Sequence, residues 1–145
     1  MFRILIIEDD PSIRDAIMEA GRTAEVETVA VSGMDIRKGL AGEIALKSEF
    51  DAVIVGGYFL EARIQDGVEV VRSIRRMKKR VIIVGTSGDS RREAAFLNAG
   101  ASGFAVRGSL NNTTAGLLTA LDLLKARDEK KRRPKKDPKP TPDQE

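Results

Sequence analysis

Five short, predominantly apolar runs, each followed by a segment with helical periodicity, constrain the fold of this chain more than any other feature. The runs lie at residues 3–7, 26–31, 51–55, 80–84 and 103–106. Short apolar strands are typical of a sheet that helices cover on both faces. Strands that alternate with helical segments favour parallel pairing. We therefore predict an α/β fold, a doubly wound parallel sheet of the (βα)₅ type.

The segments between the runs carry the signals of helices. In the first, apolar residues recur on one helical face, and Asp10 can cap the helix ahead of Pro11. The "SRRE" sequence has the pattern of a capping box, in which Ser90 and Glu93 bond the backbone reciprocally. The helix that it opens ends at Gly100, a favourable C-terminal cap. The remaining helices are predicted at 34–48, 67–77 and 114–126.

The charge of the chain is divided between a nearly neutral body and a basic tail. Residues 130–145 hold seven of the 25 Lys and Arg residues, three of the 22 acidic residues and four of the five prolines. Such a segment has no large apolar side chain to bury and is expected to be disordered. We therefore predict a single domain over residues 1–127 and a disordered tail over 128–145.

Composition excludes several kinds of site. The chain has no Cys, so disulfides, thiolate metal sites and Cys nucleophiles are ruled out. It also has no His, which removes the commonest general base and metal ligand. We therefore expect no enzymatic activity. No apolar run approaches the roughly 20 residues of a membrane span, and the first residues do not resemble a signal peptide. We expect a cytoplasmic protein that makes no membrane contact.

In a doubly wound sheet, ligands bind beyond the carboxyl ends of the strands, where the strand order reverses. Glu8, Asp9 and Asp10 follow the first run. Adjacent carboxylates at a strand end can hold Mg²⁺, although solvated loop acids with a helix cap explain the same pattern. The third run ends in Gly56 and Gly57, so no functional side chain follows it.

Five segments in order resemble a response-regulator receiver domain, and the likeness covers about residues 2–127. They are "RILIIEDDPSIRDAI", the strand "FDAVIV", "DGVEVVRSIRR", "RVIIVGTSGD" and "NAGASGFAVRGS". The resemblance implies the flavodoxin-like strand order 2-1-3-4-5. It also implies Mg²⁺ on the acids after strand one and a phosphoryl group on an Asp that ends strand three. A hydroxyl after strand four and a Lys after strand five would contact that group, and an aromatic in strand five would report switching.

Three positions of this chain keep the pattern that the resemblance implies. Glu8 and Asp9 match the acid pair, and Phe104 matches the switch aromatic. The phosphoacceptor position falls on Gly56, and no acidic residue lies between Asp51 and Glu61. An acyl phosphate therefore cannot form at position 56, and the acid pair should bind Mg²⁺ weakly at best.

Two further positions of the implied phosphorylation site are changed. The hydroxyl position falls on Gly85, with Thr86 one residue late, and the Lys position falls on Arg107. Arg cannot be deprotonated and binds carboxylates in a bidentate fork. We predict that Arg107 pairs with Glu8 or Asp9; the alternative is a solvated Arg on a loop.

The sequence favours an atypical stand-alone receiver-like signalling protein that Asp phosphorylation does not switch. It would act as a protein-interaction module, and the resemblance places its docking surface on the fourth helix, fifth strand and fifth helix, over Glu93 to Lys125. One alternative is a small-molecule or nucleotide sensor that uses a crevice lined by Gly56, Gly85 and Gly108. Another is a protein that binds nucleic acid or an acidic partner through the basic residues at 130–139.

Overall fold

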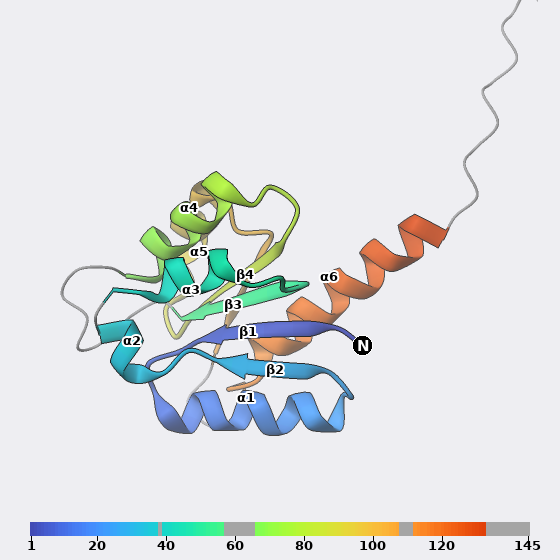
Figure 1. Cartoon of the computed structure of the whole chain (residues 1–145), viewed down its shortest axis with the longest axis horizontal. Helices are drawn as coiled ribbons and strands as arrows, with labels where there is room; N and C mark the ends of the chain where they lie inside the picture. The colour runs from blue at the N-terminus through green and yellow to red at the C-terminus, as the bar shows by residue number, and fades with distance from the viewer. Residues whose placement is uncertain (38, 57–65, 108–111, 133–145) are drawn as a thin grey trace, which may run out of the picture.

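The structure, a computed structural model, describes residues 1–37, 39–56, 66–107 and 112–132 (Figure 1). Five parallel strands form one sheet in the order β2-β1-β3-β4-β5, which confirms the predicted flavodoxin-like topology. The strands are β1 (Arg3–Ile7), β2 (Glu27–Ala30), β3 (Ala52–Gly56), β4 (Ile82–Ser87) and β5 (Gly103–Val106).

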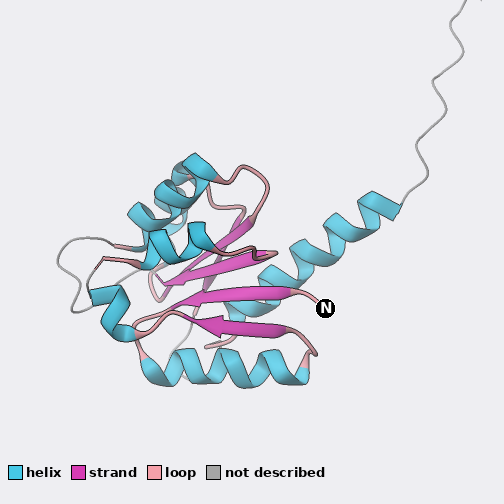
Figure 2. Cartoon of the chain, viewed as in Figure 1, coloured by secondary structure: helices cyan, strands magenta, loops and turns pink. Residues whose placement is uncertain are grey.

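Helices cover both faces of the sheet, as Figure 2 shows. One core joins the sheet to α2, α3, α4 and α5, and a second core joins the other face to α1 and α6. Successive residues of each central strand point into opposite cores: Leu5 and Ile7 enter the first, Ile4 and Ile6 the second. The helices are α1 (Pro11–Thr23), α2 (Gly33–Arg37), α3 (Ala41–Lys47), α4 (Gly67–Met77), α5 (Glu93–Ala99) and α6 (Ala115–Arg132).

The helix predicted over 34–48 is two helices, α2 and α3. Gly39 separates them with a φ of +75°, and its backbone N–H donates to the carbonyl of Ile36. A left-handed residue at this position ends a helix, and glycine adopts it without steric cost. The fourth helix expected from the sequence is therefore α5, and the fifth is α6.

The cap of the segment before α5 differs from the prediction. Asp89, not Ser90, accepts a hydrogen bond from the backbone N–H of Arg91, at 2.9 Å. Residues Ser90–Arg92 form a 3₁₀ turn, and α5 begins at Glu93. An aspartate one residue earlier thus replaces the predicted capping box. The predicted caps at Asp10 and Gly100 are confirmed.

Helix α6 extends beyond the predicted domain boundary. It continues to Arg132, so residues 128–132 are helical, while 133–145 lie outside the described residues. No Gly or Pro interrupts the chain between Gly116 and Pro134, and basic residues in the last turn favour the helix dipole. None of the helices within the described ranges is long and apolar enough to cross a membrane.

Candidate functional site

The sheet register brings the predicted site residues to one edge. Ile7 pairs with Val55, so Glu8 follows β1 beside Gly56, the last residue of β3. Gly56 in turn pairs with Thr86 of β4. Parallel strands end at the same edge, and this edge is where ligands of such sheets bind.

The Glu8 carboxylate fills the space beside Gly56. Glu8 is only 2% exposed. A Cβ atom at Gly56 would lie 3.1 Å from each carboxylate oxygen and 3.2 Å from Cδ of Glu8. The backbone N–H of Asp10 donates to Oε2 of Glu8 at 3.2 Å, which helps to fix the carboxylate in this place. The missing side chain at position 56 therefore leaves no cavity, because the Glu8 carboxylate from the neighbouring strand end occupies the space.

Arg107 forms an ion pair with Glu8, which confirms the pairing predicted from the sequence. Its Nη1 donates to Oε1 of Glu8, and the two side chains are 17% and 3% exposed. The backbone N–H of Arg107 donates to the carbonyl of Ser87 at 3.0 Å, which anchors the residue at the end of β5. The charge pair is thus largely removed from water. Charge-assisted hydrogen bonds are strong in such a buried environment.

Burial raises the pKa of Glu8 above the ordinary glutamate value. Desolvation disfavours the ionised carboxylate and is the largest cause. The positive charge of Arg107 and the backbone N–H groups of Asp10 and Asp9 act in the opposite direction and lower the pKa. Arg107 is therefore the main group that favours the ionised form of Glu8.

Phe96 explains why position 85 is a glycine. A Cβ atom at Gly85 would lie 2.3 Å from Cδ1 of Phe96, closer than real carbon atoms approach. Phe96 is completely buried, and its ring packs against Phe104 at a centroid distance of 5.5 Å. The ring thus covers the backbone of β4 where the resemblance places a hydroxyl side chain. This role of Phe96 was not predicted from the sequence. The one signal for it was the position of Phe96 on the inward face of α5.

Thr86 is buried, and its side chain packs against α6. Its hydroxyl donates to the carbonyl of Val55 at 3.4 Å. Its methyl group would lie 2.5 Å from a Cβ at Gly116 of α6, so the helix approaches β4 closely there. The hydroxyl is thus engaged with the backbone of β3, and no bond joins it to Glu8 or Arg107 among the described residues.

The similarity of this chain to known proteins is found at the level of the fold. No family model matches the sequence, and no curated protein matches it. Solved structures do match. A CheY-like response regulator receiver domain protein from Methanospirillum hungatei JF-1 has a TM-score of 0.71 and 17% identity, with 90% of this chain and 98% of that chain covered. This chain has the receiver-domain fold.

Two further receiver-fold structures show the same likeness. A two-component response regulator of the LuxR family from Aurantimonas sp. SI85-9A1 has a TM-score of 0.69 and 22% identity, covering 87% of this chain and 86% of that one. The receiver domain of sensor histidine kinase PA1611 from Pseudomonas aeruginosa PAO1 has a TM-score of 0.67 and 18% identity, covering 86% and 98%. That structure holds a magnesium ion in its active site cleft.

The described residues at this edge of the receiver fold do not fit a resident Mg²⁺. Glu8 already forms an ion pair with Arg107, and Asp9 is the only other acid that the sequence predicted as a Mg²⁺ ligand. Across the part of the chain that the structure describes, no three acidic side chains converge as a metal site would require. One residue of the predicted glycine-lined crevice, Gly108, lies outside the described residues.

Proposed function

We propose that this chain is a receiver-like signalling protein that is not switched by Asp phosphorylation and acts as a protein-interaction module. The observation that supports the proposal is the position of the Glu8 carboxylate. It lies against Gly56 and pairs with Arg107, so the acceptor position has neither a carboxylate nor free space.

Aspartyl phosphorylation at position 56 needs a carboxylate that Gly56 does not supply. An acyl phosphate forms on a free carboxylate with a cation to balance the phosphoryl charge. The buried carboxylate present, Glu8, is bonded to Arg107 and to the backbone of Asp10. A phosphoryl group would have to displace that ion pair before it could reach the site.

Three exposed apolar side chains support the interaction role. Leu97 of α5, Val106 of β5 and Leu118 of α6 are 44%, 43% and 60% exposed. They lie on the three elements that the resemblance designates as the docking surface. Exposed apolar side chains on adjoining elements are what a binding partner would cover.

Intact mass measurement tests the phosphorylation part of the proposal. The chain is incubated with acetyl phosphate and Mg²⁺, and its mass is followed over time. We expect no phosphorylated species. A stable adduct that requires Mg²⁺ would overturn the proposal, and peptide mapping of that adduct would identify the acceptor.

Substitutions on the exposed face test the interaction part. Leu97→Glu and Leu118→Glu should each abolish capture of a partner that the wild-type chain retains reproducibly. Met34→Glu is the matched control, because Met34 is also exposed, at 57%, but lies on α2. Equal loss of the partner in all three variants would contradict this docking surface.

A sensor with a glycine-lined crevice receives less support from the structure. The space beside Gly56 holds the Glu8 carboxylate, and the space beside Gly85 holds the Phe96 ring. These two glycines therefore accommodate neighbouring side chains and do not themselves open a cavity for a ligand.

A further inference from the structure

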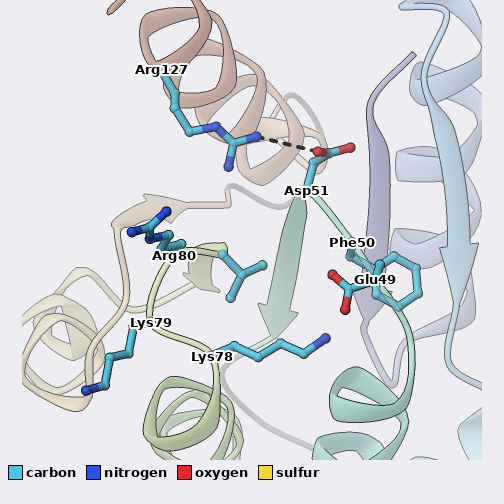
Figure 3. Close-up of a pocket in the computed structure, with 8 residues that line it drawn as sticks. Glu49, Phe50, Asp51, Lys78, Lys79, Arg80 and Arg127 are labelled. Atoms are coloured by element: carbon cyan, nitrogen blue, oxygen red, sulfur yellow. Dashed lines mark hydrogen bonds and ion pairs between the residues drawn. The ribbon is translucent and has the colours of Figure 1, made fainter. Parts of the chain in front are cut away.

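A basic pocket lies at the end of the sheet opposite the Glu8–Arg107 site. It has a volume of about 310 Å³ and is formed where the chain enters β3 and β4 and where α6 passes them (Figure 3). Its lining residues are Glu49, Phe50, Asp51, Lys78, Lys79, Arg80, Val81 and Arg127. Pockets of roughly 300–1,000 Å³ hold small ligands.

The lining carries more positive than negative charge. Four side chains are cationic and two are acidic, a surplus of two positive charges. The Asp51 carboxylate is already engaged by the backbone N–H of Arg3, at 2.8 Å, and by Nη2 of Arg127, at 3.5 Å. Asp51 therefore offers little negative charge to balance the other three cations of the pocket.

Three further cations line the pocket, and among the described residues Glu49 is the only lining acid left to balance them. Nζ of Lys78 donates to the backbone carbonyl of Ser48 at 2.6 Å, and this partner is neutral. Lys79 and Arg80 are exposed, and neither has an ion-pair partner within the described ranges. A net surplus of positive charge attracts an anion to a concave surface.

Arg127 adds a fixed guanidinium to the pocket. Figure 3 shows its side chain reaching from α6 toward Asp51, while Lys78 extends below from the end of α4. The Nε atom of Arg127 is buried and has no hydrogen-bond partner among the described residues. This atom is closed to a ligand, but the side chain as a whole is 29% exposed and adds positive charge to the pocket lining.

We propose that this pocket binds a small organic phosphate. The surplus of two positive charges matches the charge of a phosphate monoester, which is about −1.5 to −2 at neutral pH. The volume exceeds that of a phosphate group alone, and Phe50 and Val81 offer apolar surface to the organic part. The site is separate from the Glu8–Arg107 edge and does not depend on the function proposed for that edge.

The test is a titration of the full chain with inorganic phosphate and with adenosine monophosphate, followed by backbone amide NMR. We expect saturable shifts at the amides of 49–51 and 79–81, with tighter binding of the nucleotide. Arg80→Gln should weaken binding about tenfold, as loss of one charge-assisted hydrogen bond would. Arg80 has no structural partner in the described part of the chain, so this variant should fold normally.

Arg76→Gln is the matched control, because Arg76 is an exposed cation of α4 that does not line the pocket. It should bind both probes as the wild type does. Three results would overturn the proposal: no shifts at the pocket amides, shifts confined to the basic residues 130–145, or equal weakening by Arg76→Gln and Arg80→Gln.

Discussion

The carboxylate of Glu8 and the backbone of Gly56 fit against each other, so that a Cβ at position 56 would lie 3.1 Å from both carboxylate oxygens. The two residues end neighbouring parallel strands. Arg107 holds the carboxylate from the end of β5. The edge where the resemblance places a phosphoacceptor is thereby closed by an ion pair between two other strand ends.

Gly56→Asp should destabilise the fold. The new side chain meets the carboxylate of Glu8 and places a second negative charge beside it, so we expect a loss of about 2 kcal/mol or more of unfolding free energy. Urea denaturation measures the loss. Gly56→Asn, of nearly equal size but uncharged, should cost less. A Gly56→Asp variant as stable as the wild type would show that Glu8 moves aside freely.

Gly85→Ala should destabilise the fold through Phe96. The added Cβ would lie 2.3 Å from the ring, and overpacking of this kind typically costs about 1–3 kcal/mol. The same substitution should cost less in a Phe96→Leu background, because the smaller side chain leaves room. A double-mutant cycle from denaturation data measures this coupling. Purely additive effects would contradict the contact.

Glu8 should make stability depend on pH. Its pKa is raised in the folded state, chiefly by burial. The stabilisation from its protonated form is therefore fully present below the ordinary glutamate pKa and is lost as pH rises through the raised value. The Glu8→Gln variant has no titrating carboxylate at position 8, so its stability does not fall in this way as pH rises. Its stability relative to the wild type should rise with pH across that window.

Urea denaturation from about pH 4 to about pH 8 measures this dependence. Arg107→Gln should extend toward higher pH the range over which this stabilisation is lost, because the positive charge of Arg107 lowers the pKa of Glu8. Glu43→Gln, at an exposed residue of α3, is the control and should follow the wild type. If the unfolding free energies of Glu8→Gln and the wild type changed with pH in the same way, the raised pKa of Glu8 would be contradicted.

Truncation after Arg132 separates binding of nucleic acid by the tail from any role of the body. The cut keeps every described residue of α6, whereas a cut at the predicted boundary would remove residues 128–132 of this helix. If the tail drives binding, the truncated chain should lose affinity for duplex DNA, and the salt dependence of binding should become shallower. Unchanged affinity in electrophoretic or anisotropy assays would exclude the tail as the binding element.

Local sequence patterns predicted the strands and their burial well, because the strands are short apolar runs that alternate with helical segments. The strand order came from the resemblance, and the register agrees with it. The helical segment at 34–48 was predicted less well, because its division depends on the single left-handed residue Gly39. The boundary of α6 was also missed, because its last residues carry no apolar periodicity that marks them as helical.

At the candidate site, the sequence predicted which residues meet but not how they fill space. The prediction was that Arg107 pairs with Glu8 or Asp9, and the structure shows the pair with Glu8. The match of Glu8 to Gly56 and of Phe96 to Gly85 depends on side-chain packing between elements distant in sequence. A missing side chain is visible in a sequence, whereas the neighbour that takes its place is visible only in the structure.

The closed edge is tested most directly by an NMR titration of the full chain with Mg²⁺ followed by beryllofluoride, which mimics a phosphoryl group on a carboxylate. The backbone amides of Gly56 and Arg107 report on the closed edge. We expect that neither amide shifts at millimolar Mg²⁺ or after beryllofluoride is added. Saturable shifts of both amides that require both additions would contradict a closed edge, because the edge would then accept a phosphoryl group.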